Sequence, residues 1–358
     1  MKTRSASGMT RSKGAALLLL IILLGLVAVI VTTSGLRSVT ASTELQSRTT
    51  KALAMAKDAV LGYALANQDA PGGLPYPDRG YNDGNYDGNG DCVTSYTIDD
   101  PPSYDWHKYF LGRFPYLEEQ GCFSSNYDPI PAFGILPRDG NGEVLWYAVS
   151  FNLVRSDNGT FPPINTSTLS SNTGWLTVRD ESGTVISDKV AFVLFAPGDT
   201  LSGQDRSGTA PDPDNFLDRY NVGTTTYDNS DSNLDYIMAN PVKNSTNQFN
   251  DRLIYVTSYV LMNSLVERVA REILSKITYP YPPPGSGYSP PPPPSENITM
   301  PGPNAIPMDS WFYDNEWNKN MDYTRTVTQV IIHFSNCNST YTITHSGGNN
   351  VMARSGPC

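Results

Sequence analysis

The chain has few of the residues that carry enzyme chemistry. It holds three histidines and four cysteines in 358 residues, and none of them stands at the spacing of a metal site. It also lacks a Cys-x-x-Cys pair, a Gly-x-Ser-x-Gly turn and a phosphate-binding glycine loop. Acidic pairs such as Asp139 with Glu143 would suit a glycan hydrolase, but turn and surface roles explain them better. We therefore expect that the protein is not an enzyme.

Basic residues are also scarce. The 25 Lys and Arg residues are outnumbered by 35 Asp and Glu, which gives a net charge of −10 at pH 7. Nucleic acids are bound mainly through Lys and Arg contacts to phosphates, so we expect no nucleic-acid partner. Charged residues make up only 17% of the chain, while Gly, Pro, Asn, Ser, Thr and Tyr are abundant. This composition is typical of an extracellular, loop-rich protein built on β-hairpins.

The few cysteines predict disulfides. An even number in an exported domain indicates pairing, here two bridges. Sequence proximity favours Cys92 with Cys122 and Cys337 with Cys358, although four cysteines allow three pairings.

An uncharged apolar stretch begins directly after a basic leader. Residues 1–14 contain four basic residues, and Ala15 to Leu36 contain no charge at all. As a helix, this stretch would be about 33 Å long, which is enough to cross a bilayer core. It is longer than the apolar region of a secretory signal peptide, which has about 7 to 15 residues. The positive leader should stay in the cytoplasm while the rest of the chain is exported.

The junction resembles the class III leader of type IV pilins and type II secretion pseudopilins, in which a basic leader ends in Gly and the cut precedes the apolar segment. The resemblance covers residues 11 to about 66 and begins with Arg-Ser-Lys-Gly-Ala-Ala-Leu-Leu-Leu-Leu. It implies that the prepilin peptidase cuts between Gly14 and Ala15 and methylates the new N-terminus.

One position departs from the common pilin pattern. Most pilins carry Glu at the fifth mature position, where it meets the N-terminal amine of a neighbouring subunit, whereas this chain has Leu19. The departure is shared by minor members such as the large K-type pseudopilin at the pseudopilus tip, and X-type minor pilins also have leucine-rich starts. A tip subunit has no subunit above it, and an unpaired carboxylate in lipid would be costly. The resemblance therefore implies a minor or tip subunit of a type IV pilus or type II secretion pseudopilus.

The resemblance also implies partners and a location. The partners are other pilin or pseudopilin subunits, the prepilin peptidase and the inner-membrane assembly platform. The chain would first be a single-pass inner-membrane protein with a cytoplasmic N-terminus and a periplasmic head, and would then enter a periplasmic or extracellular filament. The main alternative is an uncleaved, signal-anchored periplasmic binding or sensory domain, and a second is a surface glycan hydrolase.

The expected fold class is α+β. Helical spacing of Leu45, Ala52, Ala56, Ala59 and Tyr63 continues the apolar stretch, so we expect one helix of about 50 residues to residue 66. Its second half should pack on a loop-rich antiparallel β-sheet head, as in pilins. The expected divisions are a leader (1–14), a transmembrane segment (15–36), the outer half of the helix (37–66), a head (67–278), a proline-rich linker or arm (279–309) and a C-terminal β-hairpin with a disulfide loop (310–358).

Within the head, the clearest expected strands are 144–151, 176–179 and 190–195. A second amphipathic helix should begin at Asp251, with Asp251 or Asn250 as its cap, and continue through Lys276. Its apolar stripe consists of Val256, Tyr259, Val266, Val269, Ile273 and Ile277. Residues 198–250 are expected to form long loops, and residues 326–334 and 340–344 a hairpin.

The strongest local motif is an acidic loop. Its oxygen-bearing residues stand where the first half of a calcium loop has its ligands, with Gly88 at the position of the sharp turn. The Glu expected at position 12 is replaced by Thr94. The alternative is an Asn/Asp/Gly turn without a metal. The candidate calcium ligands are Asp83, Asn85, Asp87, Asn89 and Asp91.

Overall fold

The structure is a computed structural model, and it describes residues 42–67, 70–79, 86–91, 110–120, 130–154, 163–207, 212–231, 233–243, 248–276, 308–325, 329–346 and 349–358. The first helix covers residues 42–66. The strands are β1 (Gly90–Asp91), β2 (Leu111–Arg113), β3 (Glu118–Gln120), β4 (Ile130–Pro131), β5 (Trp146–Val149), β6 (Leu176–Arg179), β7 (Val185–Ala196), β8 (Arg219–Val222), β9 (Thr225–Asp228), β10 (Asp235–Ile237), β11 (Val242–Lys243), β12 (Gln248–Phe249), β13 (Arg252–Thr257), β14 (Met321–Arg325), β15 (Gln329–Phe334), β16 (Thr340–Ser346) and β17 (Asn349–Ser355). The other helices that lie wholly within the described residues are α2 (Ser258–Lys276), α3 (Ser310–Asp314) and the short 3-10 turns η2 (Phe151–Leu153), η3 (Thr166–Ser170), η4 (Pro213–Asn215) and η5 (Trp317–Lys319).

The largest sheet has six strands and is organised around β7. One edge of β7 pairs antiparallel with β13, and the other edge pairs with β5 and then β6. Beyond these, β2 pairs antiparallel with β5, and β10 runs parallel to β6. The second half of β7 is continuously apolar and buried, as expected for a strand covered on both faces. The expected strands at 176–179 and 190–195 are therefore confirmed.

Ser150 joins two strands along one edge of β7. Its hydroxyl donates to the carbonyl of Val190 and accepts from the N–H of Leu176, with an N···O distance of 3.1 Å for the latter. Since Ser150 directly follows β5 and Leu176 begins β6, the two strands lie end to end in the same direction.

The first helix packs one face into the hydrophobic core. Its buried residues recur at helical spacing and join the core that contains β5, β6, β7 and β13. They are Ala52, Leu53, Ala56, Val60 and Ala64. In contrast, residues 42–48 are all exposed.

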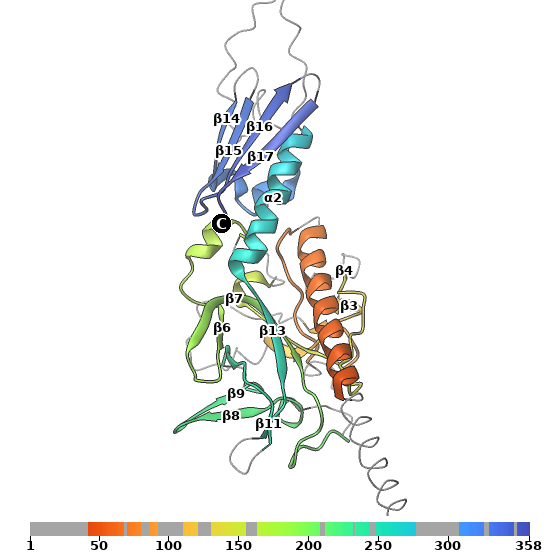
Figure 1. The fold of residues 1–358 in the computed structure, drawn as a ribbon. Coiled ribbons are helices and arrows are strands. Elements are labelled where there is room, and N and C mark those ends of the chain that lie inside the picture. Colours follow the sequence, from red (N-terminus) through yellow and green to blue (C-terminus); the bar gives the residue numbers. More distant parts are fainter. Residues whose placement is uncertain are drawn as a thin grey trace, which may run out of the picture.

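The C-terminal strands form an antiparallel sheet of their own in the order β14-β15-β16-β17. Figure 1 shows this sheet, with α2 beside it, at the opposite end of the molecule from the β8–β9 hairpin. Trp317, Phe334 and Tyr341 form its aromatic core. A disulfide joins Cys337 to Cys358, the pairing that sequence proximity favoured.

The fold class expected from the sequence was wrong. In the part of the chain that the structure describes, the first helix covers residues 42–66, not about 50 residues, and the molecule is β-rich. Its largest sheet is mixed and not antiparallel, because β10 runs parallel to β6. The segment between residues 198 and 250, expected as loops, also contains the β8–β9 hairpin and the short strands β10 to β12. These strands contain many polar residues. Because strands pair through backbone hydrogen bonds, which every residue type can make, the side-chain pattern did not predict them.

The expected start of the second helix was also wrong. Residues 252–257 form β13, paired antiparallel with β7, and α2 begins only at Ser258. Asp251 is therefore not a helix cap. Val266, Val269 and Ile273 are buried as the stripe required, but Tyr259 is exposed and Ile277 lies outside the described residues.

Candidate functional site

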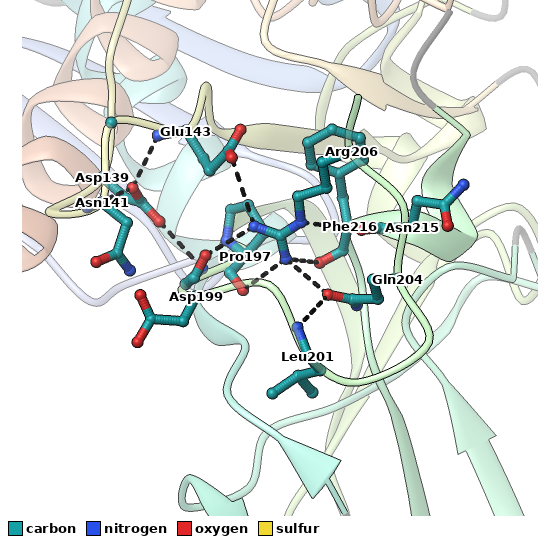
Figure 2. Close-up of polar contacts among 12 residues, drawn as sticks. Asp139, Asn141, Glu143, Pro197, Asp199, Leu201, Gln204, Arg206, Asn215 and Phe216 are labelled. Atoms are coloured by element: carbon teal, nitrogen blue, oxygen red, sulfur yellow. Dashed lines mark hydrogen bonds and ion pairs between the residues drawn. The ribbon is translucent and has the colours of Figure 1, made fainter. Parts of the chain in front are cut away.

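A buried arginine fastens the loop that follows β7 (Figure 2). The side chain of Arg206 is 7% exposed. Its guanidinium donates to the carbonyls of Asn215 at 2.9 Å and Gly198 at 2.8 Å, and to Oε1 of Gln204 at 2.9 Å. Oε1 of Glu143 lies 3.6 Å from Nη1. Because carbonyl oxygens already occupy these donors, the arginine holds the loop and is not free to bind an anionic ligand.

The ring of Phe216 connects this arginine to a second one. The guanidinium carbon of Arg206 lies 4.9 Å from the ring centroid of Phe216, and that of Arg113 lies 5.2 Å from it. Arg113 also lies 5.3 Å from the centre of Tyr86. Burial lowers the pKa of Arg113, while the neighbouring Tyr86 opposes the shift. Aromatic faces therefore contact both cations, and Arg206 is held by carbonyls as well.

The turn at residues 139–142 joins the sheet to the first helix. Asp139 accepts from the N–H groups of Asn141 at 2.8 Å and Glu143 at 3.0 Å, and its second oxygen accepts from Gly198 at 3.0 Å. Gly140 donates to Oγ1 of Thr49 at 2.9 Å. Burial raises the pKa of Asp139. Asp139 and Glu143, the sequence's candidate acidic pair, therefore have the turn and loop roles that the sequence also allowed.

Two further arginines hold the first helix. Arg252, at the start of β13, donates to the carbonyl of Gln46 and to Oγ1 of Thr50, both at 3.2 Å. Arg268 of α2 donates to the carbonyls of Leu65 and Asn67, the latter at 2.7 Å, and so caps the C-terminal end of the helix. A groove of about 200 Å3 lies beside the N-terminal part, lined by Leu45, Thr49, Asn141, Asp199, Asn250 and Arg252 among others.

Asp218 and Asp251 form a buried acidic pair. Their relative exposures are 3% and 2%. The N–H of Asp218 donates to Oδ2 of Asp251 at 2.8 Å, and the N–H of Asp251 donates to Oδ2 of Asp218 at 3.1 Å. Burial raises the pKa of both carboxyls. No sequence pattern indicated this pair, because the two residues are 33 positions apart and each stands next to a strand in a turn-rich segment.

The candidate calcium loop is described only in part. Asp83 and Asn85 lie outside the described residues. Asp87 accepts from the N–H of Asn89 at 2.9 Å, and Asp91 accepts from the N–H of Arg79 at 2.6 Å. In the described part of the chain, no three His, Cys, Asp or Glu side chains are grouped to hold a metal. Calcium binding by this loop stays a prediction.

A buried carboxylate lies beside this loop. Asp78 is 2% exposed, and its Oδ2 accepts from the N–H of Gly88 at 2.8 Å. Its other oxygen has no hydrogen-bond partner. Burial raises the pKa of Asp78 to about 8, and the negative charges of Asp91 and Asp87 add to the rise. Asp78 was not among the candidate ligands because it precedes the first residue of the motif by five positions.

The other site residues expected from the sequence are not described. Gly14 and Ala15, the expected cleavage position, and Cys92 and Cys122, the other expected disulfide, lie outside the described residues. Among the helices that the structure describes, none is both long and apolar enough to cross a bilayer. The apolar stretch 15–36 lies outside the described residues.

The described geometry thus provides structural anchors for loops and for the first helix. Searches of family models, of curated proteins and of solved structures found no match for this chain.

Proposed function

We propose that the chain is a pilin-like structural subunit, minor or at the tip, of a type IV pilus or type II secretion pseudopilus. The basic leader, the Lys13-Gly14-Ala15 junction and the apolar stretch that follows support processing after Gly14 and residence in the inner membrane. The partners are other pilin or pseudopilin subunits, the prepilin peptidase and the inner-membrane assembly platform. The activity is assembly and not catalysis.

The observation that carries the proposal is the way the first helix is held. From Thr49 onward one face is buried in the head, and arginines from β13 and α2 hold it near both ends. Residues 42–48 precede this region and are exposed. Ser42 stands six positions after Leu36, the last residue of the apolar stretch. A subunit that is pulled from the membrane by its N-terminal segment needs such a rigid attachment between that segment and its head.

The attachment has a mechanical consequence for assembly. The contacts come from three separate segments, namely the 139–142 turn, β13 and α2. A load applied along the helix is therefore shared by the central sheet and by α2, which lies beside the C-terminal sheet (Figure 1). The bonds from Arg252 and Arg268 have a charged donor, so each of these contributes more than a neutral hydrogen bond.

The N-terminal peptide of the protein extracted from its native membrane tests the proposal. We expect a peptide that begins at Ala15 and carries an added methyl group. A peptide that begins at Met1 would contradict the proposal and favour an anchored ectodomain.

A matched pair of variants makes this test sharper. Gly14→Val should block the cut and leave the leader on the chain, because the position before the scissile bond becomes bulky. Gly8→Val changes another leader glycine and should be processed normally. Equal processing of both variants would show that the cut does not depend on Gly14.

A further inference from the structure

The acidic pair, Asp218 and Asp251, lies at the root of the β8–β9 hairpin, which is the open end where the chain enters β8 and leaves β9. Asp218 directly precedes β8, and Asn229 directly follows β9. The N–H of Asn229 donates to the carbonyl of Asp218 at 3.0 Å and closes the root. Nδ2 of Asn229 donates to Oδ2 of Asp251 at 3.0 Å, and Asp251 immediately precedes β13. The pair therefore ties both ends of the projecting hairpin to the central sheet (Figure 1).

The two carboxyl groups differ in the hydrogen bonds that they receive. Asp218 accepts three: Oδ2 accepts from the N–H groups of Asn250 at 2.6 Å and Asp251 at 3.1 Å, and Oδ1 accepts from Nε2 of Gln204 at 2.9 Å. Asp251 accepts its two bonds on Oδ2 alone, and its buried Oδ1 has no hydrogen-bond partner. A charged oxygen without a donor is costly in the protein interior.

Among the described residues, no cationic side chain forms a hydrogen bond or ion pair with either carboxyl. All of the donors just named are neutral. The charged groups that act on the two carboxyls are each other and Arg206. Arg206 reaches Asp218 through Gln204, which accepts from Arg206 and donates to Asp218. From the β9 side the pair meets Asn229, whose amide is neutral and also bonds Ile237. Ionising both of two adjacent buried carboxyls is unfavourable, because the two negative charges repel each other and both are removed from water.

We propose that Asp251 carries a proton on Oδ1 in the folded protein at neutral pH, and that loss of this proton loosens the root of the β8–β9 hairpin. The proton removes the charge from the oxygen that no donor stabilises and leaves Oδ2 free to accept from Asp218 and Asn229. Asp218, with three donors, keeps its charge. The attachment of the hairpin to the sheet is thus a pH-sensitive device, independent of the filament function proposed above.

Hydrogen exchange of the full-length chain in detergent tests this proposal. Amides of residues 219–228 are compared at about pH 6 and about pH 8, and β15–β16 amides provide the reference for the intrinsic pH effect. We expect hairpin protection to fall by up to about tenfold per pH unit, as one proton allows. In Asp251→Asn, which is neutral at both pH values, the hairpin protection should not change with pH. Asp188→Asn, an exposed carboxylate, should behave like the wild type.

Three outcomes would overturn the proposal. The first is equal hairpin protection of the wild-type chain at both pH values, a measurement that needs no variant to fold. The second is the same pH dependence in Asp251→Asn as in the wild type. The third is full recovery of protection at about pH 8 on adding calcium alone, which would assign the pair to a cation. If Asp251→Asn does not fold, the wild-type comparison at the two pH values and the calcium addition still decide the question, because neither needs a variant.

Discussion

Nδ2 of Asn165 donates to the carbonyl of Asn315 at 2.7 Å, across 150 residues of sequence. Oδ1 of Asn315 accepts from the N–H of Ile164 at 3.2 Å, so the two asparagines bind each other's segments. Asn165 is fully buried and also caps η3 through the N–H of Ser167. This contact links the C-terminal part of the chain, from α3 onward, to the head.

Asn165→Ala should therefore destabilise the folded protein. The substitution leaves the carbonyl of Asn315 and the N–H of Ser167 without their partners, which costs about 1 to 3 kcal/mol for each buried group that stays unsatisfied. Urea unfolding measures this loss. Asn338→Ala, at an exposed position, serves as the control and should change the unfolding free energy little. Equal effects would show that the buried pair contributes nothing specific.

Gly140→Ala should weaken the contact between the 139–142 turn and the first helix. A Cβ at this position would lie 2.2 Å from the carbonyl oxygen of Leu45, so the turn must move away. We expect a loss of about 1 to 3 kcal/mol, the usual cost of overpacking. Gly62→Ala is the matched control, because its Cβ meets no atom within 4 Å and lies within the helix. It should stabilise the protein by about 0.5 to 1 kcal/mol, since alanine is the better helix former.

Asp78 should make the protein less stable as the pH rises. Burial raises the pKa of this carboxyl from 3.8 to about 8, so the folded state holds a proton that the unfolded chain has lost. The unfolding free energy should therefore fall from about pH 4 to about pH 8, by at most about 1.4 kcal/mol per pH unit from this group. In Asp78→Asn this contribution disappears. A variant with the wild-type pH dependence would show that Asp78 does not titrate in this range.

Removing the C-terminal disulfide should destabilise the C-terminal sheet. Cys337 and Cys358 are 21 residues apart, and a loop of that size is expected to contribute about 3 kcal/mol. The double substitution Cys337→Ser and Cys358→Ser should lower the urea midpoint accordingly. The N–H of Cys358 also donates to Oδ1 of Asn263 at 2.8 Å, so α2 retains one contact with this end. Recovery of both cysteines as free thiols from the unreduced protein would contradict the disulfide.

The sequence predicted the apolar elements better than the polar ones. Val190 to Phe195 are apolar and are followed by Pro197 and Gly198, so they were identified as part of a strand. Residues 252–257 were misassigned because Val256 fits a helical stripe and an alternating strand equally well, and only the pairing with β7 decides between them.

Most of the candidate site could not be predicted from the sequence. Asp218 and Asp251 are ordinary acidic residues in turn-rich segments, and their meaning comes from the fold that buries them side by side. Arg206 likewise binds carbonyls, which every residue has, so no motif marks its partners. The acidic loop was recognised from its spacing, but its buried neighbour Asp78 was not.

The hydroxyl of Ser150 makes β5 and β6 act as one interrupted strand laid along β7. After Ser150 the chain leaves this edge of β7, and at Leu176 it returns to the next position on the same edge. The register of β5 and of β6 is therefore set by their own pairing with β7 and by this hydroxyl.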